Sequence, residues 1–138
     1  MTNGSNSYGV TLPQITFISR LIGTHRNIGK VERTRDIQFD FVTLLGVKAR
    51  LICVNEYTCG LAKILEVLED FPGTSIIYVG GAWNSYTMQA KEYCIRARIG
   101  LFNANEINGA LYCDDYWTYS QKDEEGNPIY PTKASCSK

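Results

Sequence analysis

The sequence predicts an α/β domain built as a three-layer sandwich, in which a central mixed β-sheet is flanked by helices. Two adjacent runs rich in strand-forming residues, 36–45 and 47–58, are separated by the single Gly46, which is typical of a hairpin. Helical and extended segments then alternate, as they do in crossover connections between parallel strands. A chain of 138 residues corresponds to one such domain.

The segments ahead of the hairpin are expected to form a leader, a helix and a turn. Residues 1–12 are rich in Gly, Ser and Asn and predict a flexible leader. A helix is predicted over 13–23, because Pro13 suits a first helical position, apolar residues recur at helical spacing and Gly23 suits the end. Residues 24–35 are polar and basic, and we expect a turn there.

The segments after the hairpin are expected to alternate between helix and strand. Apolar residues recur at helical spacing after Gly60, and a Pro-Gly pair closes that segment. We expect helices over 61–71, 84–98 and 104–112 and strands over 75–79 and 101–103, with Asn84 or Ser85 as the cap of the second helix. The single domain would then span 13–112, followed by an acidic, aromatic C-terminal extension over 113–138.

The composition excludes several classes of protein. With 44% hydrophobic and 20% charged residues, the chain is neither disordered nor collagen-like. It has no apolar run of membrane-spanning length and no signal-peptide pattern, so we expect a soluble protein without membrane contact. The five cysteines and single histidine lack the paired spacing of a zinc site, and unpaired cysteines favour a reducing compartment, the cytoplasm.

The charge of the chain is divided unevenly between its two halves. Residues 1–50 hold seven lysine and arginine residues against three acidic ones, and residues 51–138 hold seven against eleven. The first half therefore predicts a basic face for phosphate groups. Its candidate nucleic-acid contacts are His25, Arg26, Lys30, Arg33 and Arg35. The acidic C-terminal segment, with its interleaved aromatic residues, predicts a surface for a protein partner.

Acidic side chains in the hairpin form a candidate metal site. Because alternate residues of a strand share a face, Asp36 and Asp40 fall on one face of the first strand, and Glu56 lies near the end of the second. Carboxylates at the ends of adjacent strands can converge on a hard cation such as Mg²⁺ or Mn²⁺. Such a cation activates water for phosphodiester hydrolysis. The alternative interpretation is that these acids are solvated strand ends.

The order of motifs and elements also carries a resemblance to a known family. An Asp in a strand (Asp40, in FDFV), a turn at Gly46 and a Glu in the next strand (Glu56, in VNEYT) follow one another. The later stretch SIIYVGGAWNSYTMQAKEYCIRARIGLFNANEINGAL continues as strand, turn, helix with an Ala-Lys-Glu core, strand and helix. In this order, residues 36–112 resemble the core of Mrr-type members of the restriction-endonuclease-like (PD-(D/E)XK) superfamily.

The resemblance implies a restriction-endonuclease-like fold and a Mg²⁺-dependent (or Mn²⁺-dependent) DNA endonuclease. Asp40 and Glu56 would be the catalytic metal ligands and Asp36 an auxiliary acid. The family has Glu-x-Lys, however, and this chain has Thr58 at the position of the lysine. A neutral hydroxyl cannot stabilise developing negative charge as a lysine does. Lys63 would have to replace it, or else Lys48 or Arg50, which share a strand face.

Two functions therefore stay open at the level of the sequence, with a third behind them. The first is a DNA endonuclease with Asp40, Glu56 and Lys63 in its catalytic site. The second is a catalytically degenerate nuclease-fold module, such as an inhibitor or accessory subunit, that binds nucleic acid through the basic half or a protein through the acidic half. The third is an unrelated small α/β ligand-binding domain. A homodimer is a further expectation from the family.

Overall fold

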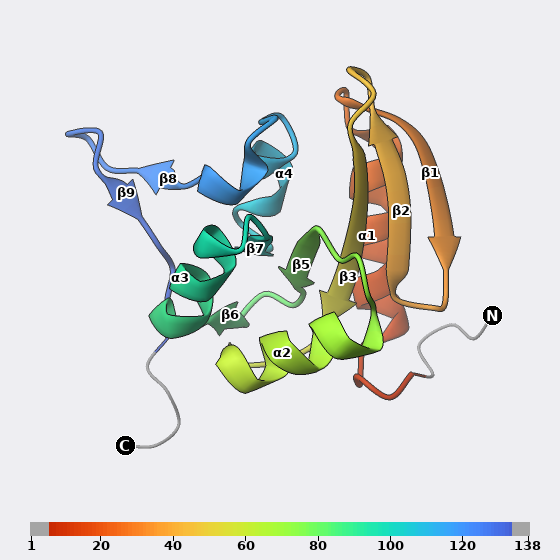
Figure 1. Ribbon diagram of the computed structural model, residues 1–138, viewed down its shortest axis with the longest axis horizontal. Helices are drawn as coiled ribbons and strands as arrows, with labels where there is room; N and C mark the ends of the chain where they lie inside the picture. The colour runs from red at the N-terminus through yellow and green to blue at the C-terminus, as the bar shows by residue number, and fades with distance from the viewer. Residues whose placement is uncertain (1–5, 134–138) are drawn as a thin grey trace.

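The computed structural model describes residues 6–133, which form four helices and nine strands (Figure 1). The helices are α1 (Leu12–Thr24), α2 (Leu61–Asp70), α3 (Met88–Arg96) and α4 (Ile107–Ala110), with a 3₁₀ helix, η1 (Tyr116–Thr118). The strands are β1 (Ile28–Thr34), β2 (Gln38–Thr43), β3 (Lys48–Val54), β4 (Thr58–Cys59), β5 (Ile76–Val79), β6 (Ser85–Tyr86), β7 (Gly100–Asn103), β8 (Gln121–Lys122) and β9 (Pro128–Ile129).

Five of these strands form one mixed sheet in the order β1-β2-β3-β5-β7. The first three strands are antiparallel neighbours, whereas β3, β5 and β7 run parallel and are joined through α2 and α3. The hairpin turn lies at Gly46, whose φ of 89° suits a residue without a side chain. The structure thus confirms the α/β class and the mixed central sheet with flanking helices. Strands β4 and β6, and β8 and β9, form two small separate ladders.

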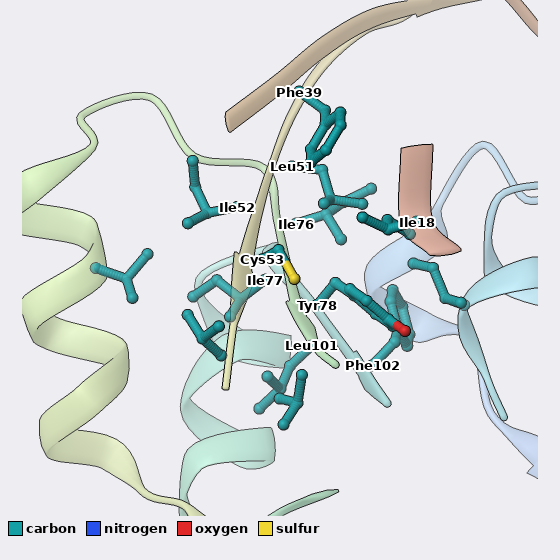
Figure 2. Packing of buried hydrophobic residues seen from close by; sticks show 14 of the residues in the cluster. Ile18, Phe39, Leu51, Ile52, Cys53, Ile76, Ile77, Tyr78, Leu101 and Phe102 are labelled. Atoms are coloured by element: carbon teal, nitrogen blue, oxygen red, sulfur yellow. The ribbon is translucent and has the colours of Figure 1, made fainter. Parts of the chain in front are cut away.

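The hydrophobic core lies on both faces of the sheet (Figure 2). Leu51 and Ile76 point toward Ile18 of α1, whereas Ile52 and Ile77 point toward the side of α2. All four residues of β5 are buried, as are all four of β7. Strands covered on both faces carry continuous apolar runs, which explains why these two were recognisable in the sequence.

The segment expected to be a turn, 24–35, instead contains the edge strand β1. Only Ile28 of this strand is buried, and its exposed side chains are mostly charged. An edge strand with charged residues resists pairing with other chains, and it lacks the apolar alternation by which strands are recognised. The sequence prediction was therefore wrong here.

Several boundaries also differ from the prediction, and three of them have a cause in the structure. The strand expected over 47–58 ends at Val54, so the residues after it leave the central sheet. Helix α3 begins at Met88, because Thr87 caps it and the expected cap Ser85 pairs in β6 instead. Helix α1 begins at Leu12, where Thr11 forms a capping box.

The terminal segments lie only partly within the described residues. The expected flexible leader, 1–12, has its first five residues outside them, while Tyr8 and Val10 are buried against the core. The expected extension, 113–138, has its last five residues outside them, and its described part carries η1 and the β8–β9 hairpin. Between residues 6 and 133, no helix combines the length and the apolar character needed to span a bilayer.

Candidate nucleic-acid interface

Asp40, the first candidate metal ligand, lies in the middle of β2 opposite Arg50 of β3. The Arg50 Nε donates to Asp40 Oδ1 at 2.8 Å, and Gln38 Nε2 donates to Asp40 Oδ2 at 3.1 Å. Arg50 also donates through Nη1 to the Pro72 carbonyl at 2.6 Å, which fixes the guanidinium in place. Both oxygens of the Asp40 carboxylate are therefore engaged by side chains of the same sheet.

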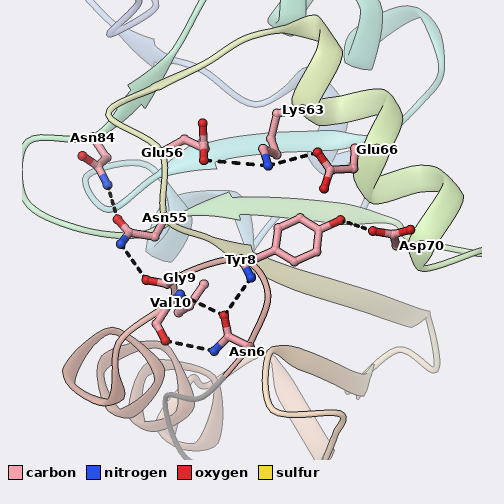
Figure 3. A network of polar contacts seen from close by, with 10 residues as sticks. All are labelled: Asn6, Tyr8, Gly9, Val10, Asn55, Glu56, Lys63, Glu66, Asp70 and Asn84. Carbon is pink, nitrogen blue, oxygen red and sulfur yellow. Dashed lines mark hydrogen bonds and ion pairs between the residues drawn. The ribbon is translucent and has the colours of Figure 1, made fainter.

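Glu56 lies beyond the end of β3 and comes together with Lys63 of α2 (Figure 3). The Lys63 Nζ lies 3.9 Å from Glu56 Oε2 and 3.0 Å from Glu66 Oε1. The structure thus joins two of the three predicted catalytic residues. Thr58, at the position of the missing lysine, lies in the separate strand β4.

Asp36, the expected auxiliary acid, lies in the β1–β2 turn rather than on the strand face. Its backbone φ is 38°, and the residue is buried. Arg33 Nη2 donates to Asp36 Oδ1 at 2.6 Å, and Asn6 Nδ2 donates to Oδ2 at 2.8 Å. Like Asp40, this carboxylate has charged or amide donors on both oxygens.

These three carboxylates do not fit the Mg²⁺ or Mn²⁺ site that the family resemblance implies. Asp40 pairs with Arg50 of β3, and Val54, the last residue of β3, lies four residues beyond Arg50. At the rise of a strand these four residues span about 13 Å. Glu56 lies further still, so its carboxylate and that of Asp40 do not converge on one ion. Within the described residues, no group of three or more His, Cys, Asp or Glu side chains is arranged to hold a metal ion.

The N-terminal segment crosses the C-terminal end of β3, next to Glu56 and Lys63 (Figure 3). The Tyr8 hydroxyl donates to Asp70 Oδ2 at 2.6 Å, and Lys63 Nζ lies 4.9 Å from the centre of the Tyr8 ring. Burial, reinforced by the Asp70 carboxylate, raises the pKa of Tyr8 above its ordinary range. Asn55 Nδ2 donates to the Gly9 carbonyl at 2.8 Å. Residues 6–10 thus cover the C-terminal end of β3.

The uncovered face of the antiparallel strands forms a charged pocket of about 450 Å³. We define this charged pocket by its lining residues Lys30, Glu32, Asp40, Phe41, Val42, Lys48, Ala49, Arg50, Gly73 and Ser75. Val42 pairs with Lys30 on one side and with Lys48 on the other, so the two lysines share one face of the sheet. Both lysines are exposed, and neither has an ion-pair partner among residues 6–133.

The five basic residues predicted to contact nucleic acid are not brought to one surface. Lys30 lies in the charged pocket and Arg26 is exposed beside β1. Arg33 lies three residues after Lys30, on the opposite face of β1, and forms an ion pair with Asp36. Arg35 Nη1 donates to the Asp70 carbonyl at 3.2 Å, and its guanidinium lies 4.3 Å from the centre of the Phe71 ring.

His25, the remaining candidate, is buried and therefore does not present a surface contact. Its Nε2 lies 2.9 Å from the carbonyl oxygen of Asn108, and its ring lies 4.2 Å from that of Tyr112. The histidine joins the end of α1 to α4. The His25 side chain therefore has a structural role.

A buried polar network between β6, β7, α3 and α4 was not predicted from the sequence. The Tyr86 hydroxyl contacts both oxygens of Glu106 at 2.8 Å, and Asn103 N donates to Glu106 Oε1 at 3.1 Å. Lys91 is completely buried and donates to the Leu101 carbonyl at 2.8 Å. Burial lowers the pKa of Lys91 to about 8 and raises that of Glu106. The available signal was that Lys91 falls on the apolar face of its helix, three residues before Cys94.

No family model matches the chain, and no curated protein or solved structure is significantly similar to it. The chemistry that these residues support therefore follows from their geometry and charge.

Proposed function

We propose that the protein binds the phosphate backbone of nucleic acids through the charged pocket and does not cleave it. The observation that carries the proposal is a contrast between two sets of charges. The candidate metal-binding carboxylates are each held by cationic or amide side chains of the chain itself. The lysines of the charged pocket, in contrast, have no such acidic partner among the described residues.

The arrangement of the two lysines supports backbone contact rather than recognition of bases. Lys30 of β1 and Lys48 of β3 flank strand β2, so their α-carbons lie two strand spacings apart, about 10 Å. An ammonium group on a flexible stem acts as a point charge toward phosphate. Glu32 lies on the same face and partly offsets the two positive charges. Weak, salt-dependent binding without sequence preference follows from this balance.

The non-catalytic part of the proposal follows from the same contacts. Asp40 would have to leave Arg50 and Gln38 before it could bind a metal ion. Arg50 is also held by the Pro72 carbonyl, so its guanidinium stays beside Asp40 and competes with a cation for the carboxylate. Glu56 and Lys63 are in contact but lie beyond the end of β3, away from Asp40.

Binding is tested by fluorescence anisotropy with a labelled duplex of about 20 base pairs, titrated over a range of salt concentrations. For a duplex, each phosphate contact contributes about 0.9 to the slope of log K against log salt concentration. The variant Lys30→Gln with Lys48→Gln is therefore expected to lower the slope by about 1.8. The matched control is Lys122→Gln, which removes an exposed lysine in β8.

A slope that stays unchanged in the double variant, or no binding by the parent at low salt, contradicts the proposed interface. Cleavage is tested separately with supercoiled plasmid in Mg²⁺ or Mn²⁺, using the parent, Asp40→Ala and Glu56→Ala. We expect the plasmid to stay intact with all three proteins. Nicking by the parent that both substitutions abolish would show a metal-dependent nuclease instead.

A further inference from the structure

The outward face of α1 forms an apolar groove on the side of the sheet opposite the charged pocket. The groove has a volume of about 730 Å³, and its apolar lining includes Leu12, Phe17 and Leu21. The side chains of Leu12 and Phe17 are each 47% exposed, although they are large and hydrophobic. Apolar side chains gathered on one helix face mark an interaction surface more often than scattered ones do.

The groove continues into a second hollow of about 280 Å³ between α1 and the loop after β5. Phe17 lines both hollows, and Gly81 and Ala82 of the loop line the second. Asn55 Oδ1 accepts hydrogen bonds from Gln14 Nε2 at 3.0 Å and from Asn84 Nδ2 at 2.8 Å. This amide network ties the start of α1, the end of β3 and the loop together, so the groove is preorganised.

The charge around the groove selects an acidic occupant. The first 31 residues of the chain contain no Asp or Glu, and Arg20 lines the groove. Across the described part of the chain, no carboxylate forms an ion pair with Arg20. An apolar surface with a single unpaired guanidinium suits a segment that combines an aliphatic side chain with carboxylates.

The β8–β9 hairpin of the same chain has this composition. Residues 121–129 are all exposed, with Asp123, Glu124 and Glu125 at the turn and the apolar Ile129 44% exposed. A two-stranded hairpin alone is marginally stable, so contact with another surface would stabilise it. Figure 1 places the hairpin at one end of the long axis and α1 in the other half of the molecule. The hairpin therefore does not reach the groove of its own chain.

We propose that the α1 groove accepts the acidic β8–β9 hairpin of a second copy of this chain. The two halves of the sequence carry opposite charge surpluses that cancel, so no net charge opposes the approach of two copies. Each copy offers one groove and one hairpin, so two copies can make the same contact twice. Two reciprocal contacts would close a symmetric dimer, the commonest form of homo-oligomer. Ile129 would meet Phe17, and the carboxylates of the turn would meet Arg20.

Sedimentation velocity of the full chain at rising protein concentration tests this contact. We expect the mass to rise from monomer to dimer for the parent, and to stay monomeric for Phe17→Ser, for Arg20→Glu and for Glu124→Lys with Glu125→Lys. The combination of Arg20→Glu with both lysine substitutions restores opposite charges and is expected to recover the dimer. The control Leu45→Ser changes an exposed leucine outside the groove and leaves the dimer intact.

The parent remaining monomeric at every concentration overturns the proposal. A dimer that survives Phe17→Ser and the hairpin substitutions also overturns it, because the contact then lies elsewhere. Failure of the charge exchange to recover the dimer overturns the pairing of Arg20 with the acidic turn. Far-ultraviolet circular dichroism of each variant shows that loss of the dimer is not loss of the fold.

Discussion

The hydroxyl group of Tyr86 lies 2.8 Å from each carboxylate oxygen of Glu106, in a place where neither side chain touches solvent. A buried carboxylate without donors costs several kcal/mol, and this contact supplies one of its few donors. Asn103 N supplies another, and the Lys91 ammonium nearby also favours the charged form. The network joins β6, β7, α3 and α4 at one corner of the fold.

Tyr86→Phe is expected to destabilise the protein by about 1–3 kcal/mol, because Glu106 loses a donor that the apolar surroundings cannot replace. The free energy of unfolding in urea measures this loss. The control Tyr57→Phe removes the hydroxyl of an exposed tyrosine and should change stability by less than about 0.5 kcal/mol. Equal effects of the two substitutions would contradict a structural role for the network.

Lys91 is expected to make stability depend on pH between about 8 and 10.5. The pKa of this lysine is about 8 in the fold and 10.5 in its ordinary state, because burial disfavours the ammonium form. Within that window the unfolded chain holds a proton that the folded chain has released. The contribution of Lys91 to the free energy of unfolding therefore rises with pH, by about 3 kcal/mol across the window.

The comparison with Lys91→Met isolates this effect. Burial raises the pKa of Cys53 and Cys59 to about 12, and these thiols lower stability as pH rises above 9. The difference in unfolding free energy between parent and variant removes their contribution. The free energy of unfolding of the parent should increase relative to that of the variant as pH increases from 8 to 10.5. A constant difference would show that Lys91 titrates normally.

Gly81→Ala is expected to destabilise the protein by about 1–3 kcal/mol. Gly81 has a φ of 101°, and an added Cβ would lie 3.1 Å from Gln14 Nε2. The matched control is Gly23→Ala, within α1 and with no atom in the way of the Cβ, which should gain roughly 0.5–1 kcal/mol. Thermal unfolding of both variants provides the measurement. Opposite signs are expected, and a neutral Gly81→Ala would contradict the close approach of loop and helix.

Glu32→Gln is expected to strengthen binding of a nucleic-acid duplex several-fold, because it removes a negative charge beside the two lysines of the charged pocket. Fluorescence anisotropy at low salt gives the affinity. The control Glu69→Gln removes an exposed carboxylate on α2 that does not line that pocket. If both substitutions strengthened binding equally, net charge rather than the charged pocket would govern the interaction.

Much of the central sheet could be predicted from the sequence, because its buried strands are apolar over their whole length. A glycine follows β5 and another begins β7, and both strands are covered on both faces, so pattern and structure agree. Strand β1 could not be predicted in the same way, since only Ile28 is buried and its other residues are exposed or half-buried at the sheet edge. The end of β3 at Val54 depends on pairing with distant β5, which local propensity does not report.

The candidate site was less predictable because charged partners are set by register and not by spacing along the chain. Asp40 meets Arg50 only because the hairpin pairs these two positions. Glu56 meets Lys63 because α2 returns along the sheet. The burial of Lys91 depends on the Phe102 and Tyr130 rings, which lie 4.4 Å and 5.6 Å from its ammonium and come from later segments.

Strand β3 is the boundary between the antiparallel and the parallel half of the sheet, and this position bears on the order of folding. The three antiparallel strands connect through short turns, so they form contacts between residues close in sequence. The parallel strands pair only after each crossover helix has closed a longer loop. We therefore expect β1, β2 and β3 to assemble first as a meander, onto which β5 and then β7 dock. Pulsed hydrogen exchange during refolding should show amides of β2 and β3 protected before those of β7.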